Sequence, residues 1–295
     1  MQLNDADAYN NSGDAYFEKG EYDRAIADYD QAIRLNPKNA KAYHKRGNAY
    51  YRSKNDHSRA IDDFDRAIEL DPNYAAAYNE RGFMYGFFVE NFDYAIKDFT
   101  ESIRLDPNNY QVFFRRGSIY GFMGDYDRSI ADFDKAIKIN PNYADAYASR
   151  GDDYARKGNY EQAFADYDQA IRINSKDKMT YFGRSLVCQI KGDVDCAIAD
   201  LSQAIQLDPD FEQAYNSRAL QYAAKRDYDL AIADYGQVIR INPKNVDAYY
   251  QRGRIYERRK QDYDKAIADW ENAHKIDPNI NVSMDIERVR QKRGF

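Results

Sequence analysis

Apolar and small side chains recur along this chain at helical spacing, in runs that are interrupted at regular intervals. Tyr9, Gly13 and Tyr16 fall at i, i+4 and i+7, the spacing that places residues on one face of a helix. After Gly20 the apolar residues resume at spacings of three and four, at Ala25, Ile26, Tyr29, Ala32 and Ile33. Glycine suits a short turn, and the Asn36-Pro37 step ends the second run because a residue before proline avoids the helical region. The pattern predicts a helix, a short turn, a second helix and a stop.

This unit of 34 or 35 residues occurs eight times in succession. Repeats two, three and eight hold one extra residue between their two helices, around Asn55, Glu90 and Gln261, where a loop absorbs an insertion easily. A fixed period of this length indicates stacked supersecondary units that share one continuous core. We therefore expect a single all-α domain over residues 1–295, with repeats at 6–39, 40–74, 75–109, 110–143, 144–177, 178–211, 212–245 and 246–280.

Large and small side chains occupy fixed positions in the repeats. With each repeat numbered from 1, position 4 is aromatic in all eight, position 8 is glycine in six and position 20 is alanine in seven. Together with an aromatic residue at 24, alanine at 27 and proline at 32, this pattern resembles the tetratricopeptide repeat over residues 6–280. The resemblance implies a right-handed superhelical solenoid of eight helix-turn-helix repeats. In that family the first helices form a concave face that holds a partner peptide or protein.

Residues 281–295 follow the last proline step and carry a different pattern. Val282, Ile286 and Val289 are spaced as in a helix, and charged residues that include Arg293 surround them. Because the end of a solenoid requires a polar cover, we expect a C-terminal capping helix over 281–295.

Two charged positions recur with the repeat. Position 23 is aspartate in every repeat, and position 7 is arginine in seven of them, at Arg46, Arg81, Arg116, Arg150, Arg184, Arg218 and Arg252. If each aspartate pairs with the arginine of the next repeat, Asp28 meets Arg46 and Asp234 meets Arg252. All seven arginines then have a partner, and repeat one needs no arginine. Pairing within a repeat would leave Asp28 facing Ser12. We expect the inter-repeat ion pairs, which would fix the stacking of the repeats, while an arginine ladder that binds an acidic ligand remains open.

The resemblance also places positions 2, 5, 9, 12 and 13 of each first helix on the concave face. Because exposed apolar patches mark partner sites, the apolar residues at these positions are candidates for partner binding. They form a first stretch at Phe83, Phe87, Phe114 and Phe122, and a second at Phe182, Leu186 and Ile190. His44, Asn48 and Arg52 add polar contacts. The clamp by which some family members hold the carboxylate of heat-shock chaperones is not expected, since Glu80 and Gln111 occupy positions where that clamp requires other residues.

Several classes of protein are not expected from the composition. The net charge of −6 argues against nucleic-acid binding, and no run of 18 apolar residues predicts membrane insertion. The first residues are neither basic nor apolar, so they do not predict a signal peptide, while a removed signal or flanking domain remains open. A cytoplasmic location is the default expectation. Cys188 and Cys196 are expected to be reduced core residues, while a disulfide or a redox role remains open. With no second cysteine pair, histidine cluster or catalytic motif, no metal, cofactor or enzymatic activity is expected.

These observations lead to one preferred function and two alternatives. We expect a protein-interaction scaffold that binds a partner peptide or protein segment in its groove by apolar anchoring, as a monomer. The first alternative is a structural self-assembly module that oligomerises through its groove or termini. The second is the interaction arm of a larger enzyme or secretion machine.

Overall fold

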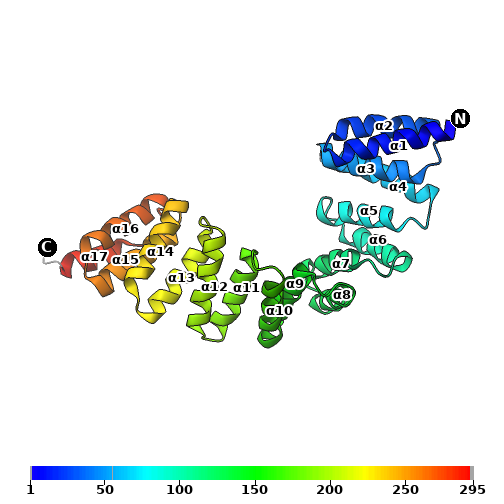
Figure 1. The fold of residues 1–295 in the computed structure, drawn as a ribbon. Coiled ribbons are helices and arrows are strands. Elements are labelled where there is room, and N and C mark those ends of the chain that lie inside the picture. The colour runs from blue at the N-terminus through cyan, green and yellow to red at the C-terminus, as the bar shows by residue number, and fades with distance from the viewer. Residues whose placement is uncertain (1, 55, 293–295) are drawn as a thin grey trace. The chain divides into compact units, whose positions relative to one another are not determined.

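The computed structural model describes residues 2–54 and 56–292, which form helices and short connections with no strand. Consecutive helices lie side by side in pairs joined by short turns (Figure 1). The helices before residue 144 are α1 (Gln2–Glu18), α2 (Tyr22–Leu35), α3 (Ala40–Lys54), α4 (His57–Leu70), α5 (Ala75–Phe87), α6 (Phe92–Leu105), α7 (Tyr110–Phe122) and α8 (Tyr126–Ile139). The predicted all-α fold of helix-turn-helix repeats is confirmed.

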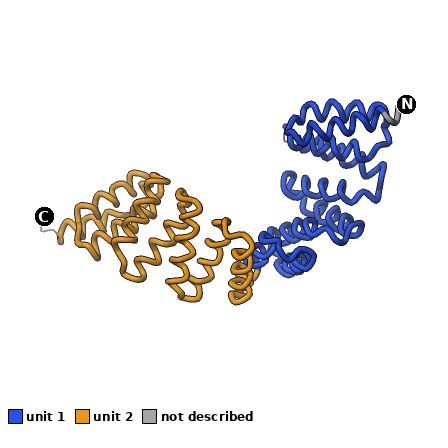
Figure 2. Tube along the Cα trace, viewed as in Figure 1, with its two compact units in different colours: residues 1–153 blue, residues 154–295 orange. Residues whose placement is uncertain are grey.

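The remaining helices continue the same alternation to the end of the described chain. They are α9 (Ala144–Arg156), α10 (Tyr160–Ile173), α11 (Lys178–Ile190), α12 (Val194–Leu207), α13 (Glu212–Lys225), α14 (Tyr228–Ile241), α15 (Val246–Ile255), the π turn η1 (Tyr256–Lys260), α16 (Tyr263–Ile276) and α17 (Ser283–Lys292). Internal contacts divide the chain into two compact units, residues 1–153 and 154–295, coloured separately in Figure 2. The prediction of one continuous domain stays a prediction.

The turns between paired helices have the backbone conformation expected from glycine. Gly20, Gly124, Gly158 and Gly192 all have positive φ, between 76° and 81°. The two described insertions adopt the same region without glycine, at Glu90 (φ 56°) and Gln261 (φ 53°), as does Arg226 (φ 68°). The third insertion, at Asn55, lies outside the described residues. An added residue therefore enters these turns as a left-handed residue and leaves the paired helices intact.

Small residues at position 8 bring the two helices of a repeat into direct contact. A Cβ placed on Gly13 would lie 2.6 Å from Cε1 of Tyr29, and one on Gly253 would lie 2.6 Å from Nε1 of Trp270. Both aromatic residues occupy position 24 and are buried. The aromatic ring thus fills the space that glycine leaves, which explains why small and large residues alternate in the sequence.

Position-7 arginines bind the position-23 aspartate of their own repeat. Arg46 donates from Nε and Nη2 to the two carboxylate oxygens of Asp63, at 2.9 and 2.6 Å. The same two-bond geometry recurs at Arg81–Asp98, Arg116–Asp132, Arg184–Asp200, Arg218–Asp234 and Arg252–Asp269.

The prediction that Asp28 pairs with Arg46, and each aspartate with the next repeat's arginine, was wrong. The two partners project toward each other from the facing helices of one repeat. Repeat one has Ser12 at position 7, and Oδ2 of Asp28 is buried there without a hydrogen-bond partner. The unpaired aspartate is therefore the first in the series, as pairing within a repeat requires.

The arginines nevertheless connect neighbouring repeats, through position 25. Nη1 of Arg46 donates to Oδ1 of Asp30 in the preceding repeat at 2.6 Å. Equivalent ion pairs join Arg81 to Asp65, Arg150 to Asp134 and Arg184 to Asp168. Hydroxyl groups replace the carboxylate for Arg116, which donates to Thr100, and for Arg218, which donates to Ser202. Arg252 faces Gly236, which offers no side chain.

The two cysteines form a disulfide across the turn of repeat six. Cys188 lies on α11 and Cys196 on α12, and their Cα atoms are 5.9 Å apart, within the range that a disulfide spans. The expectation of reduced core cysteines was wrong. Positions 11 and 19 of a repeat face each other across the short turn, so two thiols placed there meet.

The predicted capping helix is present as α17. Val282 and Val289 are buried against Trp270, and Ile286 packs beside them. Two cations of α17 also bind the buried Glu257 of η1: Arg288 donates to its two oxygens at 3.0 and 2.9 Å, and Lys292 donates at 2.9 Å. Residues 293–295, with Arg293, lie outside the described part of the chain.

Candidate interaction surface

The first helices of neighbouring repeats contact each other at α1 and α3 and at α5 and α7. The side chains that the first helices expose in each unit are here called the first-helix face. In unit 1 its centre is aromatic: the ring of Phe83 lies 5.0 Å from that of Phe87, 5.6 Å from Phe88 and 6.1 Å from Tyr51. Phe87 and Phe88 are 43% and 41% exposed, whereas Phe83 is half-buried beneath them. The exposed rings of Phe87 and Phe88 therefore pack on the half-buried ring of Phe83.

Polar and charged groups border the aromatic cluster. The guanidinium of Arg115, on α7, lies 4.4 Å from the ring centroid of Phe83 and donates to Asn79 and Glu80 at 3.1 Å. On the other side the ring of His57 stacks on Phe88, with centroids 4.2 Å apart. Sequence reasoning missed Phe88, which lies just after α5 and outside the family's concave positions. The apolar run Phe87-Phe88-Val89 was the available signal.

The predicted first stretch of four phenylalanines is divided in the structure. Phe122 is the most exposed of them, at 76%, and its ring contacts Phe92 of α6. Phe114 is half-buried and packs on Phe133 and Tyr143. Among the described residues, ring contacts join Phe83 only to the other members of its own cluster and to neither of these two. Phe87 and Phe122 are therefore the exposed members of the predicted first stretch.

The three polar candidates differ in accessibility. His44 is half-buried between Phe64 and Tyr74, and its ring nitrogens are within hydrogen-bond distance of the Tyr74 hydroxyl (3.0 Å) and of Asn48 (3.3 Å). Burial, with the nearby Lys45 charge, lowers the pKa of His44 to about 4. Arg52 is exposed and lies over Tyr51. Of the three, Arg52 is the one best placed to meet a partner.

In unit 2 the first-helix face is aliphatic. Leu186 and Ile190 of α11 are 41% and 58% exposed, and Phe182 is half-buried against Phe211. Met179, on the same helix, is 55% exposed, and Leu220 of α13 is 45% exposed. Leu220 was not identified from the sequence, although it holds position 9, as Leu186 does in the preceding repeat.

Comparisons with known proteins match this repeat pattern directly. Tetratricopeptide-repeat families match residues 13–53, 51–86, 110–143, 144–177, 219–259 and 246–280. The chain belongs to the tetratricopeptide-repeat family. Members of this family generally mediate protein–protein interactions, and the repeat itself is generally a non-catalytic scaffold. No curated protein sequence matches the chain.

Solved tetratricopeptide-repeat structures share the fold. The C-terminal part of a repeat protein from Cytophaga hutchinsonii has a TM-score of 0.70 and 21% identity, covering 82% of this chain and 98% of its own. YrrB, "a TPR protein with an unusual peptide-binding site", has a TM-score of 0.54 and 23% identity, covering 63% and 95%. MamA has a TM-score of 0.52 and 27% identity, covering 58% and 92%.

Among the described residues, the one group with metal-ligand spacing is already engaged. Ligand atoms of Cys188, Cys196 and Asp200 lie within 4.8 Å of one another. Both sulfurs form the disulfide, and the Asp200 carboxylate accepts two hydrogen bonds from Arg184. None of the described helices combines the length and hydropathy needed to cross a membrane.

Proposed function

We propose that this tetratricopeptide-repeat protein is a scaffold that binds segments of a partner protein on its first-helix face through apolar anchors. The observation that carries the proposal is the location of the exposed large hydrophobic side chains. Most of them lie on first helices or directly after them, as Phe87, Phe122, Leu186, Ile190 and Leu220 do. Second helices expose few, among them Tyr94 and Leu230. Apolar groups concentrated on one face mark a site that another molecule covers.

The anchors fall into two sets with different chemistry. The set in unit 1 is aromatic: Phe83 packs against the exposed Phe87, and Phe122 is exposed beside Phe92. The other predicted members of this set are Phe114, Arg52, His44 and Asn48. The set in unit 2, Phe182, Leu186 and Ile190, is mostly aliphatic. Interface energy concentrates in a few buried anchors, each contributing about 2 kcal/mol or more. A partner segment would therefore place aromatic or aliphatic side chains on these two sets.

Selection from a displayed library of random 16-residue peptides on the whole chain tests this proposal. Selected peptides would be titrated against Phe87→Ser with Phe122→Ser, and against Leu186→Ser with Ile190→Ser. The matched controls are Tyr94→Ser and Leu230→Ser, which remove similarly exposed side chains from second helices. We expect at least a tenfold loss of affinity in one of the double variants and none in the controls, with the thermal midpoint unchanged.

Loss of affinity in the controls but not in the double variants, or peptides that bind all variants equally, would contradict the proposal. Light scattering across a range of protein concentrations addresses the self-assembly alternative. A mass that rises with concentration in the wild type and stays constant in the serine variants would identify a second copy as the occupant.

A further inference from the structure

A small hollow opens between repeats seven and eight, on the face that unit 2 presents with its first helices. It encloses about 210 Å³ and its wall combines apolar, aromatic and basic residues. The lining residues are Leu220 and Ala223 of α13, Tyr228 and Tyr235 of α14, Gln251, Arg254 and Ile255 of α15, and Arg258 and Arg259 of η1. Nothing in the repeat pattern explains why arginines gather here in a chain of net charge −6.

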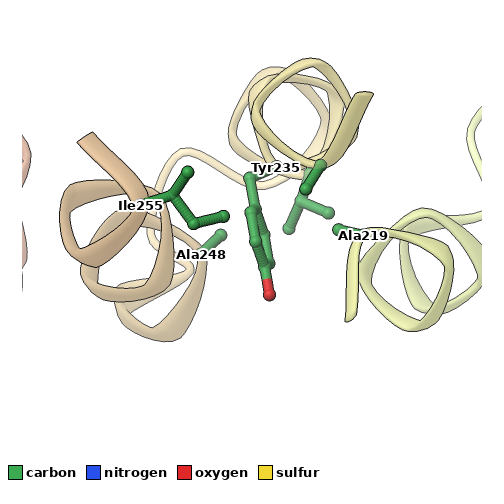
Figure 3. Close-up of a cluster of buried hydrophobic side chains, with 6 residues drawn as sticks. Ala219, Tyr235, Ala248 and Ile255 are labelled. Atoms are coloured by element: carbon green, nitrogen blue, oxygen red, sulfur yellow. The ribbon is translucent and has the colours of Figure 1, made fainter. Parts of the chain in front are cut away.

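The floor of the hollow contains the hydroxyl of a buried tyrosine. Tyr235 is 1% exposed, and its ring passes between Ala219 of α13 and Ala248 and Ile255 of α15. Figure 3 shows the hydroxyl oxygen at the far end of the ring, pointing away from α14 and emerging between the other two helices. In the described part of the chain, no residue forms a hydrogen bond with it. Burial raises the pKa of Tyr235, so the hydroxyl remains a donor at neutral pH.

Two arginines of the wall also lack an acidic partner among the described residues. Arg254 donates only to Oε1 of Gln251, at 3.3 Å, and Arg259 lies with its guanidinium 5.3 Å from the ring centroid of Tyr228. The position-7 arginine of the same repeat, Arg252, shows the contrast, because it binds both oxygens of Asp269. A guanidinium that lines a hollow and has no carboxylate partner within the protein can bind a carboxylate of another molecule.

The nearby carboxylates already have partners. Glu257 is bound by Arg288 and Lys292 of the capping helix. Asp247 accepts a hydrogen bond from Gln251 at 3.1 Å. The hydrogen bond from the neutral Gln251 leaves Asp247 charged, but no carboxylate among the described residues forms an ion pair with Arg254 or Arg259.

An apolar path leads to this hollow along the first-helix face. Leu220 forms part of its wall and is 45% exposed. The adjacent Gln221 donates to Gln189 of α11 at 3.1 Å, so α13 lies against the helix that carries Leu186 and Ile190. A partner segment on these aliphatic anchors would bring its following residues to Arg254 and Arg259.

We infer that the hollow binds the side-chain carboxylate of an aspartate or glutamate in a partner segment, next to an apolar residue that packs on Leu220. This inference rests on the proposed scaffold function and specifies the chemistry of the partner. A carboxylate can accept two hydrogen bonds from a guanidinium and a third from the Tyr235 hydroxyl. The overall negative charge of the chain disfavours long polyanions, which leaves a single acidic group flanked by apolar residues as the matching ligand.

An array of 12-residue peptides tests the inference on the whole chain. Each peptide carries a leucine pair. The residues that follow, at varied spacing, include one or two glutamates in the test peptides and glutamines at the same positions in their counterparts. Further peptides carry one phosphoserine or no acidic residue. We expect the glutamate peptides to bind at least tenfold more tightly than their glutamine counterparts. This advantage should disappear in Arg254→Gln with Arg259→Gln and shrink in Tyr235→Phe. Arg240→Gln, which removes an exposed arginine paired with Asp210 elsewhere on α14, is the matched control and should retain the advantage.

The outcomes separate this inference from the proposed function. Glutamate and glutamine peptides that bind equally, with binding lost in Leu186→Ser with Ile190→Ser, would overturn the carboxylate site and keep the scaffold. A phosphoserine peptide that binds more tightly than every glutamate peptide would overturn the assignment to a carboxylate. Failure of all peptides, while displayed-library selection also yields none, would count against both. Circular dichroism of each variant must show an unchanged thermal midpoint for the comparison to hold.

Discussion

The guanidinium of Arg46 forms two hydrogen bonds to the carboxylate of Asp63 in its own repeat, while its third nitrogen binds Asp30 of the preceding repeat. The side chains of Arg46 and Asp63 are 19% and 7% exposed, whereas that of Asp30 is 41% exposed. One arginine therefore makes a largely buried contact that orients the helices of a repeat and a more solvated contact that joins two repeats. Removing the two contacts should therefore lower the free energy of unfolding by different amounts.

Arg46→Leu should destabilise the fold far more than Asp30→Ala. The first change leaves the buried Asp63 unpaired and should cost about 3–5 kcal/mol of unfolding free energy. The second removes a partly solvated ion pair and should cost under about 1 kcal/mol. Urea unfolding of the two variants checks this. Equal losses would mean that the inter-repeat contact is as important as the contact within the repeat.

His44 should make stability depend on pH between about 6.5 and 4. Its pKa falls from 6.5 to about 4 in the folded state, mainly because of burial. In that interval the unfolded chain binds the proton and the folded chain does not, so stability falls as the pH is lowered, by up to about 3 kcal/mol. Urea unfolding at pH 4 to 7 should show a smaller slope in His44→Gln than in the wild type. The exposed His274→Gln serves as the control, and a slope unchanged in His44→Gln would refute the assignment.

The capping helix should loosen in acid through Glu257. Although burial alone would raise its pKa, the bonds from Arg288 and Lys292 outweigh this and hold the pKa of Glu257 below its usual 4.5. The stabilisation is therefore present above about pH 4.5 and is lost as the pH falls through the lower folded value.

The single tryptophan reports on this helix, because Trp270 packs against Val282 and Val289. Its fluorescence should shift to the red at a higher pH in Arg288→Ala than in the wild type. Deleting residues 281–295 should give the shifted spectrum at neutral pH and promote association through the uncovered apolar face. A truncated chain that stays monomeric with an unshifted spectrum would show that α17 covers nothing.

Reduction of the Cys188–Cys196 disulfide should lower stability moderately. The bond closes a short loop, with a sequence separation of 8, for which loop-closure entropy predicts about 2–3 kcal/mol. Chemical unfolding with and without reductant measures the difference, and Cys196→Ser should be insensitive to reductant. Alkylation of the protein inside cells would show whether the bond forms there. A predominantly disulfide-bonded pool would argue against the cytoplasmic expectation, because such bonds persist in oxidising compartments.

The sequence by itself determined the repeat, its helices and their internal packing. These features depend on local rules: periodic apolar positions, glycine in the turns, proline after the second helix and a glycine such as Gly13 opposite Tyr29. Each repeat meets the same rules with little reference to distant residues, so the pattern predicted the fold and the capping helix. The same regularity hid the ion-pair partners. An aspartate at position 23 is compatible with the arginine of its own repeat and with that of the next, and only Asp28 distinguishes the two arrangements.

Tertiary structure alone decided the features that depend on one particular neighbour. Phe87 is exposed and Phe83 half-buried because the chain places other aromatic rings and Arg115 over the latter. Cys188 meets Cys196 because the turn of repeat six brings positions 11 and 19 together. Arg254 and Arg259 form a basic wall because the fold brings them to one hollow and no carboxylate among the described residues pairs with either. Sequence spacing specifies which face of a helix a residue occupies, but accessibility and charge balance are set by every chain segment that packs around it.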